Sequence, residues 1–281
     1  MREVLKELPD TLKLALPIFL GMVGHMLIQL TDSIMLGHYG TLELAASAFG
    51  SSLVLLILYI GIGFGQAVSA LASAAKGAGD DLKARGIYEL SARSAFVFSI
   101  FCVVLSIAIL PVYDLLGQPP LVAAWAKPYS LLIALSFIPA LIFQTLRSYY
   151  EVLKRPWVPF LFLFVTVVLN IFFNYILIFG AFGLPALGII GSGLGTILAR
   201  LATVVLFVGF AHRPKEALHE KFAGALPLPE LPKILKIAGA SGAQMVAMTL
   251  AYTLGGLWIG TMGVEAIAAN RMVGMFDGTV Y

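Results

Sequence analysis

The sequence has few charged residues and almost no cysteine. Of its 281 residues 12% are charged and 60% are hydrophobic, whereas a soluble domain is typically about 25% charged. Its single cysteine, Cys102, excludes an intramolecular disulfide and a cysteine metal site. It also lacks the Lys- and Arg-rich runs that bind nucleic acid, so no nucleic-acid partner is expected. With a mean hydropathy of +0.96, these features indicate a protein that crosses the lipid bilayer several times.

Apolar runs long enough to cross a membrane recur along the whole chain. A helix needs about 20 apolar residues to span the hydrocarbon, and only helices satisfy their own backbone hydrogen bonds there. We therefore predict an all-α polytopic membrane protein. The predicted spans are 14–36, 45–73, 94–113, 124–146, 157–180, 186–211 and 235–260, and an eighth begins near Ile267.

The basic residues lie almost entirely in alternate segments between these runs. The N-terminal segment and the segments after the second, fourth and sixth spans hold 15 Lys and Arg, whereas the opposite loops hold only Lys127. Because basic segments stay on the cytoplasmic side, this pattern predicts a cytoplasmic N-terminus. We expect a multi-pass protein of the plasma (inner) membrane.

The chain matches itself when it is shifted by 223 residues. Residues 9–46 and 232–269 share eleven identities in 38 positions, including Gly37/Gly260 and Gly40/Gly263. Both copies begin on the cytoplasmic side, so the repeat is parallel, a plan in which transporters place the substrate between two halves. We predict a six-helix lobe at 1–213, a cytoplasmic linker at 214–233 and the start of a second lobe at 234–281. Two such units would make about 446 residues, so the sequence is interpreted as truncated; the alternative is a half-sized protein that dimerises.

One acidic residue, Asp32, lies inside the first apolar run. A carboxylate at membrane depth costs a few kcal/mol or more, which makes it a functional-site hypothesis; the alternative is a helix end in contact with headgroup water. His25 and Gln29 precede it by seven and three residues, on the same helical face. His25 is either a proton relay or a packing residue.

Polar residues recur in three later runs. Asn170 and Asn174 share a helical face and either bind a cation or hold helices together. Gln66 and Gln144 either line a cavity or join helices. Arg200 is expected near a span end, where its side chain would reach the interface.

Several motifs resemble those of the multidrug and toxic compound extrusion (MATE) family. The resemblance begins at about residue 9 and extends to the C-terminus. Its motifs are TDSIMLGH at 31–38, GIGFG at 61–65, the segment from Asn170 and Asn174 to Gly180, and 188–196. Four weak motifs in the family order and spacing form a fairly specific pattern.

The resemblance implies a twelve-helix secondary antiporter with two six-helix lobes, not an enzyme. Such proteins export organic cations and drugs in exchange for H⁺ or Na⁺ and use no cofactor beyond that ion. By resemblance, the cation-coupling residues, and a possible Na⁺ site, are Asp32, Asn170, Asn174 and Thr196. The substrates would be small amphipathic or cationic compounds, and the full-length protein would be a monomer in the bilayer.

The sequence departs from the family at two positions. Asn174 and Met248 stand where many members have Asp and Glu. With one carboxylate left at the site, we favour H⁺ over Na⁺ as the coupling ion. Two alternatives stay open: a flippase for lipid-linked oligosaccharides or polysaccharides, and a truncated membrane protein that does not transport.

Overall fold

The computed structural model describes residues 2–213, 218 and 227–280, with side chains described from residue 14 to 274 within these ranges. This described part contains helices and no strand, and seven of its segments are long and apolar enough to span a membrane, which confirms the predicted spans. Most of the predicted linker, 214–217 and 219–226, lies outside the described residues. The long helices are α1 (Arg2–Tyr39), α2 (Thr41–Gly77), α3 (Asp81–Ala108), α4 (Pro120–Leu135), α5 (Phe137–Val152), α6 (Trp157–Phe179), α7 (Gly188–Ala211), α8 (Leu231–Gly260) and α9 (Val264–Val280).

The fourth predicted span consists of two helices, α4 and α5, which meet at Ser136. Pro139 follows three residues later and has no N–H to donate to the preceding turn, which interrupts the helical ladder. The Ser136 hydroxyl donates instead to the Ile133 carbonyl at 2.6 Å. The third helix begins earlier than the predicted span 94–113, because α3 starts at Asp81. Asp80 caps its first turn by accepting a hydrogen bond from the Lys83 amide at 2.8 Å.

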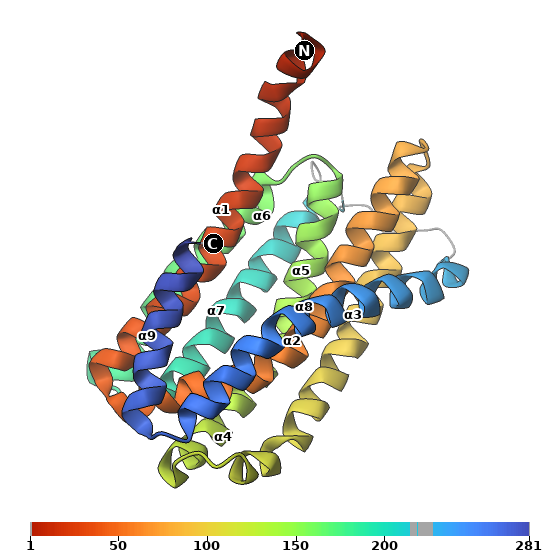
Figure 1. Cartoon of the computed structure of the whole chain (residues 1–281). Helices are drawn as coiled ribbons and strands as arrows, with labels where there is room; N and C mark the ends of the chain where they lie inside the picture. Colours follow the sequence, from red (N-terminus) through yellow and green to blue (C-terminus); the bar gives the residue numbers. More distant parts are fainter. Residues whose placement is uncertain (1, 214–217, 219–226, 281) are drawn as a thin grey trace.

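The helices alternate in direction through the bundle. Figure 1 shows the N-terminal end of α1, the α2–α3 turn and the α5–α6 loop on the same side of the molecule. These are segments in which the sequence concentrates basic residues. The structure therefore places these three basic segments at one end of the bundle, as the alternation of charge predicts.

The two copies of the internal repeat form equivalent helix pairs, α1–α2 and α8–α9. Gly40 alone separates the first pair, and residues 261–263 separate the second, with Gly263 directly before α9. The glycines aligned by the repeat therefore both lie in the turn between the two helices of a pair. Gly263 has φ of +122°, a conformation that residues with a Cβ rarely adopt.

Helix α8 crosses α2, as Figure 1 shows, and the two backbones are in close contact at the crossing. The approach depends on Gly63 of α2 and Gly242 of α8. A Cβ on Gly63 would overlap the Ala238 carbonyl, and one on Gly242 would lie 2.7 Å from the Ile60 Cα. Small residues at this crossing let the two backbones meet, as in other membrane helix pairs.

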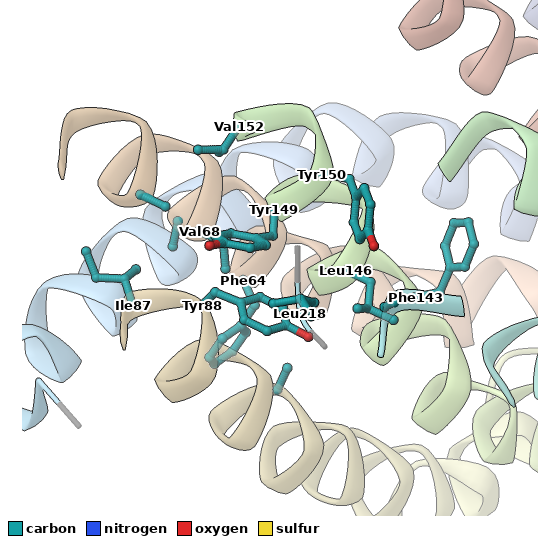
Figure 2. Close-up of a cluster of buried hydrophobic side chains, with 14 of the residues drawn as sticks. Phe64, Val68, Ile87, Tyr88, Phe143, Leu146, Tyr149, Tyr150, Val152 and Leu218 are labelled. Atoms are coloured by element: carbon teal, nitrogen blue, oxygen red, sulfur yellow. The ribbon is translucent and has the colours of Figure 1, made fainter. Parts of the chain in front are cut away.

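A large apolar cluster fills the bundle between α2, α3, α5 and α7 near their basic ends. Figure 2 shows its aromatic members, including Tyr88 and Tyr149, whose rings stack with centroids 4.5 Å apart. Phe207 of α7 stacks on Phe162 of α6 at 4.5 Å. This packing fixes α6 and α7 relative to α5 and so positions the polar residues that these two helices carry deeper in the bundle.

Candidate functional site

A chain of hydrogen bonds links Asp32 of α1 to three polar residues of α6 and α7. The Asn174 Nδ2 donates to Asp32 Oδ1 at 2.5 Å and lies 3.4 Å from Asn170 Oδ1. Asn170 Nδ2 in turn donates to the Thr196 Oγ1 at 3.4 Å. The four-residue spacing places both amides on one face of α6, and α1 and α7 flank that face. The structure thus brings together the four residues predicted as a cation-coupling site, here called the Asp32 cluster.

The Asp32 cluster is closed off from solvent on the side of α6 and α7. Asn170, Asn174 and Thr196 are 1%, 0% and 3% exposed, and Asp32 is partly buried. The Asn174 Oδ1 is fully buried and accepts no hydrogen bond from the described residues. Gly195 of α7 lies against this oxygen, since a Cβ there would overlap it. The cluster therefore holds one acid, two amides and a hydroxyl, with one buried acceptor unused.

Two arginines lie within electrostatic reach of Asp32, Arg200 of α7 and Arg271 of α9. Arg200 was expected near a span end, but the structure shows that this was wrong. It lies in the middle of α7, and its Nη1 donates to the Ser136 Oγ at 2.6 Å, at the break between α4 and α5. The interrupted helix offers a hydroxyl at membrane depth, so the guanidinium binds inside the bundle and does not extend to the interface.

Arg271 connects α9 to α1 immediately beside Asp32. Its Nε lies 3.1 Å from the Oγ of Ser33, which is 2% exposed. Among the residues whose side chains the structure describes, Arg271 forms no ion pair.

A cavity of about 640 Å³ lies between α1, α2, α8 and α9. Its walls are mainly apolar and aromatic, with a few polar groups, and its volume falls in the range of about 300–1,000 Å³ that holds drug-sized ligands. The two repeat-related helix pairs form its walls, so it lies where the parallel repeat predicts a substrate site. This space is called the interlobe cavity below.

The repeat also relates the lining residues of the interlobe cavity to one another. Three positions on α1 correspond, after a shift of 223 residues, to three positions on α8 that line the same cavity. These pairs are Met26 and Thr249, Gln29 and Tyr252, and Leu30 and Thr253. The same shift pairs Arg271 of α9 with Ala48 of α2, and both line the cavity. At these four pairs of positions the two sides of the cavity are related by the repeat, and Arg271 and Ala48 differ in charge.

The predicted cavity residues fall in different places. Gln29 lines the interlobe cavity, but His25, Gln66 and Gln144 do not. His25 lies on the exposed part of α1, within electrostatic reach of Arg147 and Arg200.

The other two glutamines lie at helix contacts. Gln66 lies 3.7 Å from the Met245 sulfur, between α2 and α8. Gln144 of α5 packs against Gly65 of α2. Met248, at the position where many MATE members have Glu, is 69% exposed and lies outside the cavity.

Sequence reasoning missed Arg200 and Arg271 as parts of the site. Both lie within predicted spans, and an ionisable residue at membrane depth is a functional-site hypothesis whatever the sign of its charge. The signal that identified Asp32 would have identified both arginines.

Comparison with known proteins places this geometry in a family. The MatE family model matches residues 17–176. A probable multidrug resistance protein NorM of Rhizobium meliloti (strain 1021) is 28% identical over 274 residues, which cover 96% of this chain and 59% of that protein. The one of Bradyrhizobium diazoefficiens is 30% identical, with 95% and 58% covered.

Solved structures share the fold. The Vibrio cholerae MATE transporter VcmN in its bent form has a TM-score of 0.79 at 22% identity, over 99% of this chain and 62% of that one. The eukaryotic MATE transporter AtDTX14 has a TM-score of 0.76 at 17% identity, over 97% and 60%.

The fold and the family match define a multi-pass membrane protein. The chain belongs to the MatE family. The probable multidrug resistance proteins and the MATE transporters named above are the proteins that it resembles. It spans about three fifths of the length of the curated relatives that it matches.

Proposed function

We propose that the protein acts as a secondary active antiporter that exports amphipathic organic compounds, including organic cations and drugs, in exchange for H⁺. The observation that carries this proposal is the position of α1. Its Asp32 bonds to Asn174 of α6, while its Gln29 and Leu30, within one turn, form a wall of the interlobe cavity. One helix thus joins an ion-binding carboxylate to a drug-sized cavity.

The charge on Asp32 controls how firmly α1 is held. A hydrogen bond from an amide to a carboxylate is stronger than one to a neutral acid, and interhelical polar contacts in membranes contribute about 0.6–2 kcal/mol. Protonation of Asp32 weakens its contact with Asn174. The resulting shift of α1 changes the wall that carries Gln29 and releases the bound compound.

The orientation of Asn174 supports H⁺ over Na⁺. Sodium prefers oxygen ligands, as hard cations do. The amide presents its Nδ2 to Asp32, however, and its Oδ1 faces Gly195. A Na⁺ ion held by Asp32, Asn170, Asn174 and Thr196 would require this amide to turn, whereas a proton needs only the carboxylate.

The test is efflux of ethidium from cells that express the protein, driven by a pH gradient at constant Na⁺. Asp32→Asn should reduce pH-driven efflux by about tenfold or more, equivalent to about 1.4 kcal/mol. Asp114→Asn is the matched control, because Asp114 is exposed and pairs with Lys127 at 2.6 Å, away from the Asp32 cluster. Efflux by Asp32→Asn at the control level would refute the mechanism. A requirement for Na⁺ at a fixed pH gradient would refute the choice of ion.

A further inference from the structure

A second hollow, apart from the interlobe cavity, lies between α3 and α8. It is a groove of about 400 Å³ with Phe64 of α2 at its base, and it shares no lining residue with the interlobe cavity. Figure 1 shows the N-terminal part of α8 beside α3, and the two helices are in contact. One wall therefore precedes the predicted linker in the sequence and the other follows it. This space is called the α3–α8 groove below.

The α3–α8 groove is apolar along most of its length and faces outward. Val97 and Phe101 of α3 line it and are 67% and 55% exposed, and both lie in the predicted span 94–113. The rings of Phe64, Phe98 and Phe101 contact one another in series, with centroids 4.8 and 5.6 Å apart. Aromatic packing of this kind forms the wall before any ligand arrives. In a bilayer, a hydrocarbon chain is the molecule that fills such a groove, since a void would forfeit its dispersion contacts.

One end of the α3–α8 groove carries the guanidinium of Arg93. This residue is exposed and directly precedes the span 94–113, on the side of the α2–α3 turn, where the basic segments lie. Two lysines from the same two sides of the molecule, Lys83 and Lys233, both pair with Glu230, at 3.3 and 3.1 Å. Arg93 forms no ion pair with any side chain that the structure describes. Its charge is therefore the one beside the groove that the protein leaves without a counter-charge.

We propose that the α3–α8 groove binds an anionic phospholipid, with its phosphate at Arg93 and an acyl chain along the apolar lining. Basic pockets between membrane helices bind anionic headgroups, and a guanidinium matches the geometry of a phosphate. A zwitterionic phospholipid offers the same chains but brings a cation of its own beside Arg93. The groove therefore selects by headgroup charge and holds by chain.

A lipid in this groove would connect two parts of the chain that the predicted linker separates. Its chain contacts Phe101 of α3 and Leu235 of α8 only while these helices keep the spacing seen here. A ligand that binds one arrangement in preference to others stabilises that arrangement. The site is independent of the proposed function, because it involves neither the Asp32 cluster nor the interlobe cavity.

The experiment compares two phospholipids with the same acyl chains. Dioleoyl phosphatidylglycerol is anionic and dioleoyl phosphatidylcholine is zwitterionic. Each is titrated into the purified protein in detergent, and native mass spectrometry counts the lipids bound to each molecule. The first phosphatidylglycerol should bind about fivefold more tightly than the first phosphatidylcholine, which corresponds to about 1 kcal/mol for one basic residue near the headgroup.

Substitutions of Arg93 test the headgroup contact. Arg93→Gln should weaken phosphatidylglycerol binding by about fivefold and change phosphatidylcholine binding by less than about twofold, and Arg93→Lys should retain part of the preference. Arg213→Gln is the matched control, because it removes the same charge from an exposed position in another basic segment, after α7 and outside the groove. It should leave both affinities unchanged.

A bulky side chain tests the groove itself. Val97→Trp would occupy the space of the acyl chain and should weaken binding of both lipids by about fivefold or more. Ile100→Trp is the control on the same helix, since Ile100 is 44% exposed and does not line the groove. It should bind both lipids as the native protein does.

Each outcome decides one part of the assignment. No preference for phosphatidylglycerol in the native protein, or an equal loss in Arg93→Gln and Arg213→Gln, would refute the headgroup contact. Unchanged binding in Val97→Trp would refute the groove, and if that variant fails to fold, the Arg93 variants still decide the site. Because no transport is measured, a failure here leaves coupling through Asp32 intact, and a failure of coupled efflux leaves the lipid preference intact.

Discussion

Asn174 turns the nitrogen of its side-chain amide, not the oxygen, toward Asp32. The Nδ2 donates to Asp32 Oδ1 at 2.5 Å, and the buried Oδ1 accepts no hydrogen bond from the described residues. This orientation gives the Asp32 carboxylate a hydrogen-bond donor inside the bundle. The Oδ1 of Asn174 faces away from Asp32. A metal ion beside Asp32 would gain an oxygen ligand from this position only if the amide rotated or if another residue replaced Asn174.

Replacement of Asn174 by aspartate tests this relationship. Asn174→Asp places a second carboxylate beside Asp32, and two close carboxylates repel unless a cation lies between them. We expect binding or efflux of ethidium to become dependent on Na⁺ at constant pH, by about fivefold or more, which is a typical coupling between two sites. Asn174→Gln, which adds no charge, is the control. An Asn174→Asp variant with no response to Na⁺ would show that the cluster does not form a cation cage.

A methyl group at Gly195 should disrupt the Asp32 cluster without touching Asp32. The Cβ of Gly195→Ala would overlap the Asn174 Oδ1 and displace the amide. We expect pH-driven efflux to fall by about tenfold, as for a lost charge-assisted bond. The control is Gly209→Ala on the same helix, since a Cβ there meets nothing within 4 Å. Equal efflux by the two variants would contradict the geometry of the cluster.

The crossing of α2 and α8 should tolerate no side chain at Gly242. The Cβ of Gly242→Ala lies 2.7 Å from the Ile60 Cα, and overpacking of this kind costs about 1–3 kcal/mol. At Gly239, a Cβ meets nothing, so Gly239→Ala should be neutral or should stabilise α8 by up to about 1 kcal/mol. Thermal unfolding in detergent, followed by tryptophan fluorescence, measures both. A higher melting temperature for Gly242→Ala would refute the close crossing.

The bond between Arg200 and Ser136 should stabilise the interrupted α4–α5 span. Ser136→Ala removes the acceptor at 2.6 Å from the Arg200 Nη1, which should cost about 1–3 kcal/mol. Ser94→Ala is the control, because the Ser94 hydroxyl bonds only within its own helix, to the Leu90 carbonyl at 2.8 Å. The comparison uses the melting temperature of each purified variant. If the melting temperature falls no further in Ser136→Ala than in Ser94→Ala, the hydrogen bond between Arg200 and Ser136 does not stabilise the fold.

The number of spans could be predicted from the sequence, but the shape of two of them could not. Hydropathy reports where a chain enters and leaves the lipid, since every apolar run of sufficient length is driven into it. Hydropathy does not report where a helix extends beyond its apolar run, as α3 does at its N-terminal end from Asp81. The polar first turn of α3 is helical because the Asp80 side chain caps it. The break at Ser136 depends on Pro139, whose effect could have been included in the prediction.

The composition of the Asp32 cluster came from the family resemblance, and its geometry came from the fold. Asp32, Asn170, Asn174 and Thr196 lie on three helices, and only their packing shows which atom of Asn174 faces the carboxylate. Likewise Gln29, Gln66 and Gln144 are equivalent by sequence criteria, yet only Gln29 lines the interlobe cavity.

The sequence by itself determined that this chain is a helical membrane protein with seven apolar spans, a parallel repeat and one costly acid in its first span. These properties follow from composition and spacing, because transfer of each segment into lipid depends mainly on that segment. Only the tertiary structure decided that Arg200 turns inward to Ser136 and that Arg271 faces the interlobe cavity. The position of a charged side chain depends on partners that other helices bring to it, and distance along the chain does not encode those partners.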